Sequence, residues 1–116
     1  MAVLSNDEID QRLRALPGWL RQGSAIVHQF AFKGFPEAVA FVSRLVPGAE
    51  AADHHPDLSV TWGRITVKLS THSAGGITDK DFELARRIED AALWRPGDGS
   101  ALRGTQGKWV RGGDPR

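Results

Sequence analysis

The sequence predicts an α+β domain in which a four-stranded antiparallel sheet carries three helices packed on one face. Apolar residues follow a helical repeat in three segments and a two-residue repeat in the segments between them. The segments run in the order helix, two strands, helix, two strands, helix. Because the strands have one apolar face each, the helices are expected to cover that face.

The first helix is predicted to begin at Ser5, because Glu8 follows at the spacing of a capping box. The Pro17-Gly18 pair ends it. A hairpin is then expected between Trp19–Arg21 and Ala25–Phe32, across a polar turn. The apolar face of the helix comprises Ile9, Leu13 and Leu16.

The second helix is predicted from Pro36, which suits a first helical turn, and Pro47-Gly48 is expected to interrupt it. Its apolar stripe comprises Ala38, Phe41, Val42, Leu45 and Val46. The third helix is predicted to start at Thr78 as N-cap and to end near Trp94. Residues 1–94 are thus one domain, and the glycine-rich residues 95–116 are expected to be a flexible tail.

The second hairpin is predicted to turn at Gly63-Arg64, because glycine suits the first central position of a type II′ turn. Apolar residues should then pair across the two strands. The expected pairs are Trp62 with Ile65, Val60 with Val67, and Leu58 with Leu69. Extending this ladder places His55 opposite His72, with His54 beside them.

Composition excludes several functional classes. The chain of 116 residues has no cysteine, so disulfides, thiolate zinc sites and cysteine nucleophiles are excluded. A net charge of +1 disfavours a dedicated nucleic-acid binder. No apolar run reaches the roughly 18–20 residues that span a membrane, and the N-terminus does not resemble a signal peptide. A cytoplasmic protein is expected.

Three histidines near one end of a hairpin predict acid/base chemistry. Histidine exchanges protons near neutral pH, so His54, His55 and His72 could supply an acid and a base together. Zinc binding by the same residues is the alternative. Adjacent strand residues point to opposite faces, which disfavours convergence of His54 and His55 on one metal ion. His28 is expected to be structural.

At these residues the sequence resembles the pterin-4a-carbinolamine dehydratase family. The resemblance covers roughly residues 4–94. It rests on the ordered segments Leu16-Pro17-Gly18-Trp19, Glu50-Ala51-Ala52-Asp53-His54-His55-Pro56-Asp57, Val67-Lys68-Leu69-Ser70-Thr71-His72, and Gly76-Ile77-Thr78-Asp79-Lys80-Asp81 with Ala85. The combined spacing is far more specific than any one segment.

The resemblance implies an enzyme that converts 4a-hydroxytetrahydrobiopterin to quinonoid dihydropterin and water, in tetrahydrobiopterin recycling. It implies no metal and no cofactor, since the pterin is the substrate. The catalytic residues carried over are His54, His55 and His72, and which of them is acid and which is base stays open. Glu50 or Asp81 could hold an imidazole in the required tautomer. The substrate-binding residues carried over are Glu50, His54, His55, Pro56, Thr71, His72, Ser73, Ala74 and Asp81.

Two other functions remain open at this point. One is a binding module for the dimerisation helices of a transcription factor, as in some family members. The other is an enzyme or chaperone acting on a molybdopterin-related pterin. A homo-oligomer, dimer or tetramer, is also expected, because Ala25–Phe32 would be a poorly protected edge strand that a twofold mate could pair.

Overall fold

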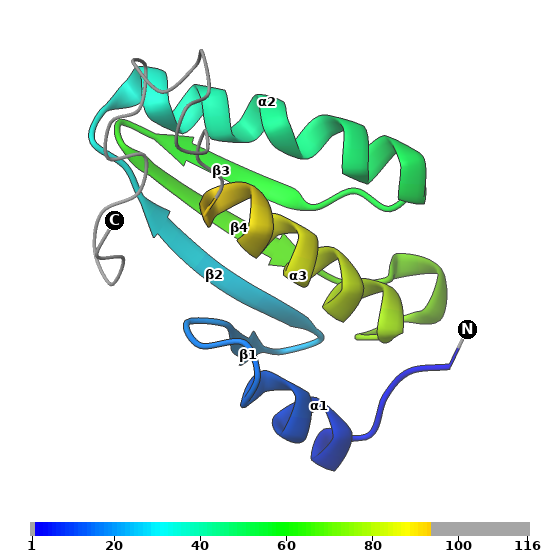
Figure 1. Ribbon diagram of the computed structural model, residues 1–116. Helices are drawn as coiled ribbons and strands as arrows, with labels where there is room; N and C mark the ends of the chain where they lie inside the picture. The colour runs from blue at the N-terminus through cyan, green and yellow to red at the C-terminus, as the bar shows by residue number, and fades with distance from the viewer. Residues whose placement is uncertain (1, 94–116) are drawn as a thin grey trace, which may run out of the picture.

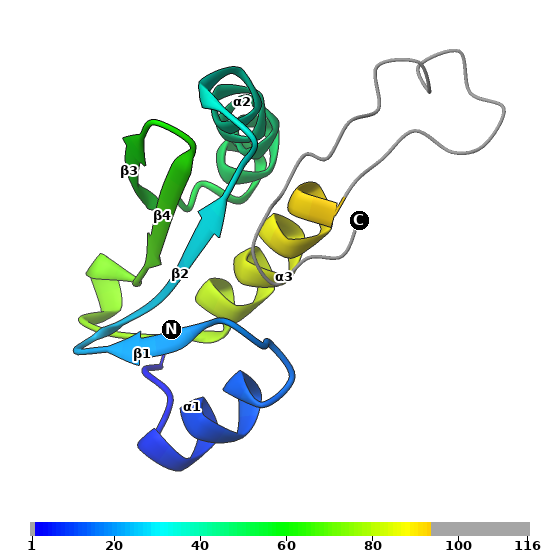
Figure 2. The same ribbon diagram turned by 90° about the vertical axis from the view of Figure 1, so that its left-hand side faces the viewer.

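Four antiparallel strands form one sheet in the computed structural model, which describes residues 2–93. The helices α2 (Phe35–Ala52) and α3 (Asp79–Leu93) lie over one face of it, and α1 (Asn6–Leu13) lies beyond β1 (Figures 1 and 2). The strand order is β1 (Leu20–Gln22), β2 (Ala25–Ala31), β4 (Arg64–Leu69), β3 (Asp57–Thr61). This architecture confirms the predicted α+β fold. The predicted tail, residues 95–116, lies outside the described residues.

A single apolar core fills the space between the sheet and the helices. In β4 the inward Ile65, Val67 and Leu69 alternate with outward polar residues, and in β2 Ile26 and Phe30 share the inward face, as the two-residue repeat predicted. On the outward face, the Arg64 guanidinium donates a hydrogen bond of 3.0 Å to Gln29 Oε1. The largest buried side chains of the core include Ile26, Ile65, Val67 and Leu69 from the sheet and Phe41, Phe82 and Ile88 from the helices.

The predicted interruption of the second helix at Pro47-Gly48 is wrong, since α2 continues through both residues to Ala52. Proline removes the hydrogen bond that its own N–H would donate, and its ring crowds the carbonyl four residues earlier. Leu45 and Ala49, on either side of Pro47, are both buried in the core, and their packing offsets that loss. The helical turn beyond Pro47 places Glu50 at the end of the sheet where β3 begins.

The predicted register of the second hairpin is also wrong, by two residues. The observed pairs join Val60 to Ile65 and Leu58 to Val67, around a turn at Trp62-Gly63. Gly63 has φ +72° and occupies the second central position of the turn, where a left-handed conformation favours glycine. A shift of two residues keeps every side chain on its predicted face, so alternation alone could not detect it.

The predicted edge strand Ala25–Phe32 is an interior strand. In the structure β2 pairs with β1 on one side and with β4 on the other. The edges of the sheet are β1, which is three residues long, and β3. Dimerisation through β2, which the sequence suggested, is therefore not available, and only β1 or β3 could extend the sheet.

Candidate functional site

The three predicted histidines lie at one end of the sheet. Asp57, the first residue of β3, pairs with Lys68 near the end of β4. His54 and His55 come just before β3, and His72 comes just after β4 in the short 3₁₀ turn η1 (His72–Ala74). The C-terminal end of α2 and the start of α3 meet at the same end, on the right of Figure 1.

A left-handed residue sends the two adjacent histidines in different directions. Asp53 ends α2 with φ 49° and ψ 43°, a conformation that aspartate tolerates better than most residues. The N–H of His54 donates to the Ala49 carbonyl at 3.1 Å and closes the helix end. After this reversal His54 is buried whereas His55 is exposed.

His54 is held by a carboxylate that has no contact with solvent. Its Nε2 lies 2.6 Å from Oδ1 of Asp81, whose exposed fraction is 0%. The second oxygen of Asp81 accepts hydrogen bonds from the Thr71 hydroxyl and from the Thr78 N–H, each at 2.9 Å. Because an ionised carboxylate only accepts, this arrangement places a proton on Nε2 of His54.

The same carboxylate also starts α3. The Lys80 N–H donates to the Thr78 hydroxyl at 3.3 Å, so Thr78 is the N-cap that the sequence predicted. Asp81 returns to the Thr78 N–H from the first turn of the helix. Asp81, one of the residues expected at the substrate, is thus completely buried and lies in hydrogen-bonding contact with His54.

His55 has an exposed acidic partner instead. Its Nε2 lies 2.5 Å from Oε2 of Glu50, and the two side chains are 56% and 67% exposed. Glu50 belongs to the last turn of α2, the turn that lies beyond Pro47. This pair is open to solvent and to a ligand, in contrast to the pair formed by His54.

His72 is an exposed residue on a turn that is fixed by its backbone. Thr71 and Gly76 form a β-bridge on either side of η1. Gly75 closes the turn with φ 79° and donates to the Thr71 carbonyl at 2.9 Å. Ser73 and Ala74, the other residues expected at the substrate, complete this turn.

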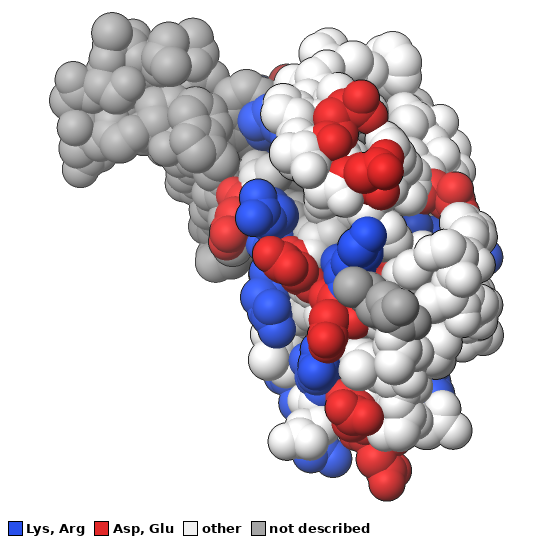
Figure 3. All heavy atoms as spheres, turned by 90° about the vertical axis from the view of Figure 1, so that its right-hand side faces the viewer, with Lys and Arg blue, Asp and Glu red and all other residues white. Residues whose placement is uncertain are grey.

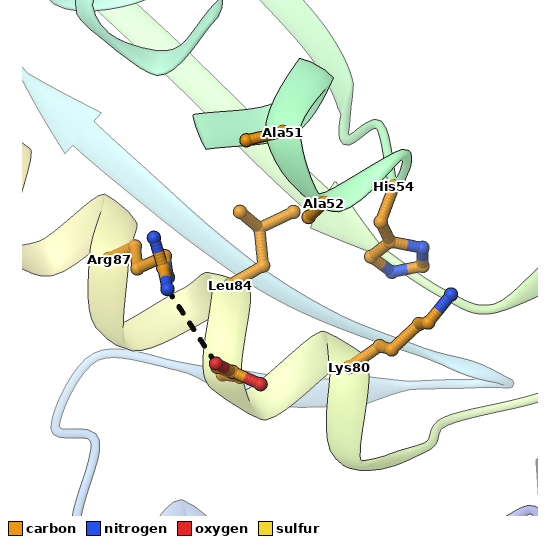
Figure 4. Close-up of a pocket in the computed structure, with 7 residues that line it drawn as sticks. Ala51, Ala52, His54, Lys80, Leu84 and Arg87 are labelled. Atoms are coloured by element: carbon orange, nitrogen blue, oxygen red, sulfur yellow. Dashed lines mark ion pairs between the residues drawn. The ribbon is translucent and has the colours of Figure 1, made fainter. Parts of the chain in front are cut away.

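His54 and His55 line two different hollows. One hollow, of about 260 Å³, lies between the end of α2 and α3, and His54 points into it toward Lys80 (Figure 4). The other, of about 210 Å³, lies between α2 and β3 and is lined by Glu50, His55 and Pro56 with apolar neighbours. The sequence placed these histidines together, and the structure separates their side chains as adjacent residues on an extended chain separate.

Charges of both signs are interspersed on the face of the molecule that carries this end (Figure 3). Within the hollow beside His54, Arg87 forms an ion pair with Glu83 at 3.7 Å, drawn in Figure 4. A surface of this kind provides no strong field for a polyanion.

The geometry does not support the zinc alternative. Among residues 2–93, no three histidine or acidic side chains are placed to share one metal ion. The described residues therefore hold no three-ligand set of the kind that catalytic zinc uses.

His28 lies apart from the other three histidines, on β2 beneath α3. Its ring stacks on Phe30 with centroids 4.0 Å apart, and its Nε2 lies 3.5 Å from Oε1 of Glu89. The same Glu89 oxygen accepts a 2.7 Å hydrogen bond from Trp19. Burial lowers the pKa of His28, while the charge of Glu89 and the Gln29 carbonyl act in the opposite direction.

This environment predicts an acid-sensitive contribution to stability. A lowered pKa means that the folded protein binds fewer protons at His28 than the unfolded chain does. The contribution is complete above about pH 6.5 and is lost as the pH falls through the lower pKa of the folded state. In urea unfolding measured at several pH values, His28→Gln should flatten this decline. A decline of unchanged steepness in the variant would contradict the assignment.

Comparisons with known proteins identify the family of the chain. The sequence model described as "Pterin 4 alpha carbinolamine dehydratase" matches residues 2–91. A relative from Roseiflexus castenholzii, provisionally named as a pterin-4-alpha-carbinolamine dehydratase, is 52% identical over 91 residues, which are 78% of this chain and 98% of the relative. The chain belongs to the pterin-4a-carbinolamine dehydratase family.

Solved structures share the fold. A crystal structure from Brucella melitensis, described as a transcriptional coactivator/pterin dehydratase, has a TM-score of 0.75 and 37% identity, covering 78% of this chain and 98% of that one. A pterin dehydratase-like protein described as a RuBisCO assembly factor in the alpha-carboxysome has a TM-score of 0.58 and 21% identity, covering 67% and 93%. The second likeness concerns the fold alone.

Proposed function

We propose that the protein is a 4a-hydroxytetrahydrobiopterin dehydratase that uses its histidines as acid and base. The observation that carries this proposal is the buried pair of His54 and Asp81 at the end of the sheet. Nδ1 of His54 has no hydrogen-bonding partner among the described residues. With a proton fixed on Nε2, Nδ1 is free to accept a proton from a substrate.

The reaction balances without any further reactant. A base removes the proton from N5, and the electron pair of that bond forms the double bond between N5 and C4a. The bond between C4a and the hydroxyl oxygen breaks as an acid protonates the oxygen, and water leaves. His54 supplies the base, and the exposed His55 or His72 supplies the acid. The product is the quinonoid dihydropterin, which tetrahydrobiopterin recycling consumes.

The test follows loss of the 4a-carbinolamine by its ultraviolet absorbance, with and without protein. Acceleration in proportion to protein concentration is the expected result. No acceleration would favour the other two functions, a binding module or a protein that acts on a molybdopterin-related pterin. A protein that acts on a molybdopterin-related pterin would be recognised by activity on that pterin and none on the 4a-carbinolamine.

We also expect the reaction to need no metal. The balance above requires neither a Lewis acid nor a redox group, and residues 2–93 hold no group of three side chains placed to bind a metal ion. Protein that has been dialysed against a chelator should therefore keep its full turnover. Loss of turnover that added zinc restores would contradict a metal-free mechanism.

A homo-oligomer is proposed as the working state. The outer face of α2 exposes large apolar side chains in a helical stripe, Phe35, Val39 and Val46. The edge strand β3 also leaves backbone groups unpaired on its outer side. Both surfaces suit contacts with further copies of the chain.

Light scattering at micromolar concentration should give a mass of two or four times the 12.6 kDa of one chain. Val46→Lys is expected to weaken any association through α2, because it places a charge at the C-terminal end of the stripe. Ala51→Lys, at an exposed position on another side of the same helix, is the matched control. A mass of 12.6 kDa for the unaltered protein would contradict the proposal.

A cytoplasmic location is the remaining part of the proposal. Within residues 2–93, no helix combines the length and apolar character needed to cross a membrane. Fractionation of cells that produce the protein would test the location.

A further inference from the structure

Two threonine hydroxyls lie beneath His54 and have no role in the chemistry described above. Thr71 is 4% exposed and Thr78 is fully buried. Their Oγ1 atoms are 2.8 Å apart, and Thr71 Oγ1 is 2.9 Å from Oδ2 of Asp81. They come from different elements, Thr71 from the end of the strand region before η1 and Thr78 from the start of α3.

The direction of each hydrogen bond follows from the groups involved. Asp81 only accepts, so the single hydroxyl proton of Thr71 points to Oδ2. Thr71 therefore accepts from Thr78, whose hydroxyl in turn accepts from the Lys80 N–H. The chain of donors runs from the helix backbone through both hydroxyls to the carboxylate.

This chain fixes which oxygen of Asp81 faces His54. Two donors, the Thr71 hydroxyl and the Thr78 N–H, converge on Oδ2. The carboxylate must then accept at Oδ1, so His54 must donate from Nε2. Without the Thr71 hydroxyl, Oδ2 loses one of its two donors, and without the Thr78 hydroxyl, Thr71 loses the donor that holds its own oxygen in place. Either loss loosens the orientation of the carboxylate toward His54.

We propose that Thr71 and Thr78 are positioning residues that fix the tautomer of His54, and so keep its Nδ1 ready to accept a proton. The importance of that tautomer for turnover rests on the proposed dehydratase function. Thr71 has a second part in the site, because its backbone carbonyl accepts from Ala74 and Gly75 and so anchors the turn that carries His72. Thr71 thus helps to position both His54 and His72.

The test uses the full chain with Thr71→Val and Thr78→Val, which remove each hydroxyl while keeping its shape. The nitrogen chemical shifts of the His54 ring, measured by NMR on the free protein, report the tautomer directly. In the original protein Nε2 should carry the proton, and in both valine variants the share of that tautomer should fall. Turnover should fall about ten-fold with little change in KM, the size of one lost hydrogen bond to a charged group.

Serine at the same positions separates positioning from packing. Thr71→Ser and Thr78→Ser retain the hydroxyl, so they should restore both the tautomer and most of the turnover. Ser70→Ala is the matched control, because the Ser70 hydroxyl donates to the Ser24 carbonyl at 2.7 Å and not to Asp81. It should change neither measurement.

An unaltered tautomer in both valine variants would overturn the proposal, whatever happens to turnover. So would a loss of turnover that serine fails to restore. If the protein has no dehydratase activity, the NMR measurement still decides whether the hydroxyls set the tautomer. Failure of the proposed function and failure of this inference are therefore separate outcomes.

Discussion

His55→Ala and His72→Ala should each lower the turnover of the 4a-carbinolamine by roughly 10²–10⁴-fold, the usual cost of losing a general acid or base. Both side chains are exposed at the end of the sheet where β4 ends and β3 begins. Neither side chain contributes to the core, so the variants should unfold at nearly the same urea concentration as the original protein. Steady-state rates and urea unfolding check the two halves of this expectation.

His28→Gln provides the control, because His28 lies on β2 beside Trp19 and Glu89 and away from this end. It should keep most of the turnover when measured at a temperature where the variant is folded. Equal and small effects at His28, His55 and His72 would mean that the histidine cluster is not the active site. A loss confined to His55 or to His72 would identify a single acid and leave the other residue as a substrate contact.

Local patterns predicted most of the fold. The capping box of Ser5 and Glu8 and the cap of Thr78 are present as expected, because these signals depend on neighbours within four residues. Alternation assigned the faces of β2 and β4 correctly. These features need no knowledge of distant contacts.

The errors all concern information that lies outside the local sequence. Pro47 remains helical because Leu45 and Ala49 pack into a core built by distant segments. The hairpin register depends on whether Gly63 takes the first or second central position of the turn, and both satisfy the alternation. The interior position of β2 depends on its pairing with β4, 37 residues away at Gln29 and Thr66.

For the site, the sequence indicated the histidines and two carboxylates that could hold them, Glu50 and Asp81, but not which carboxylate holds which histidine. His54 and Asp81 are 27 residues apart, and only the packing of α2 against α3 brings them together. One signal was available, since an aspartate three residues after the cap Thr78 has the spacing to return to that cap. That spacing predicts the hydrogen bond that Oδ2 of Asp81 accepts from the Thr78 N–H. It does not predict the contact of Oδ1 with His54.

Asp81→Asn should have the largest effect of any single change that preserves side-chain shape, a fall in turnover of roughly 10²–10⁴-fold. Oδ2 of Asp81 accepts from Thr71 and from the Thr78 N–H, so the amide oxygen must take that position. The amide NH₂ then faces Nε2 of His54, which must accept rather than donate. The proton of the ring moves to Nδ1, and the base is lost. The same change in the orienting aspartate of serine proteases lowers turnover by about 10⁴-fold through the wrong tautomer.

The matched control is Asp79→Asn, the same chemical change two residues earlier in the same helical turn. Asp79 is exposed and pairs with Arg12 at the surface, where an ion pair contributes about 0–1 kcal/mol. It should leave turnover and the His54 tautomer unchanged. Asp81→Ala, by contrast, leaves buried donors without an acceptor and should lower the free energy of unfolding by about 1–3 kcal/mol for each. If Asp81→Asn kept both its turnover and the proton on Nε2, the carboxylate would serve only to start α3 and would not set the tautomer of His54. If turnover were kept while the proton moved to Nδ1, His54 could not be the base that this site requires.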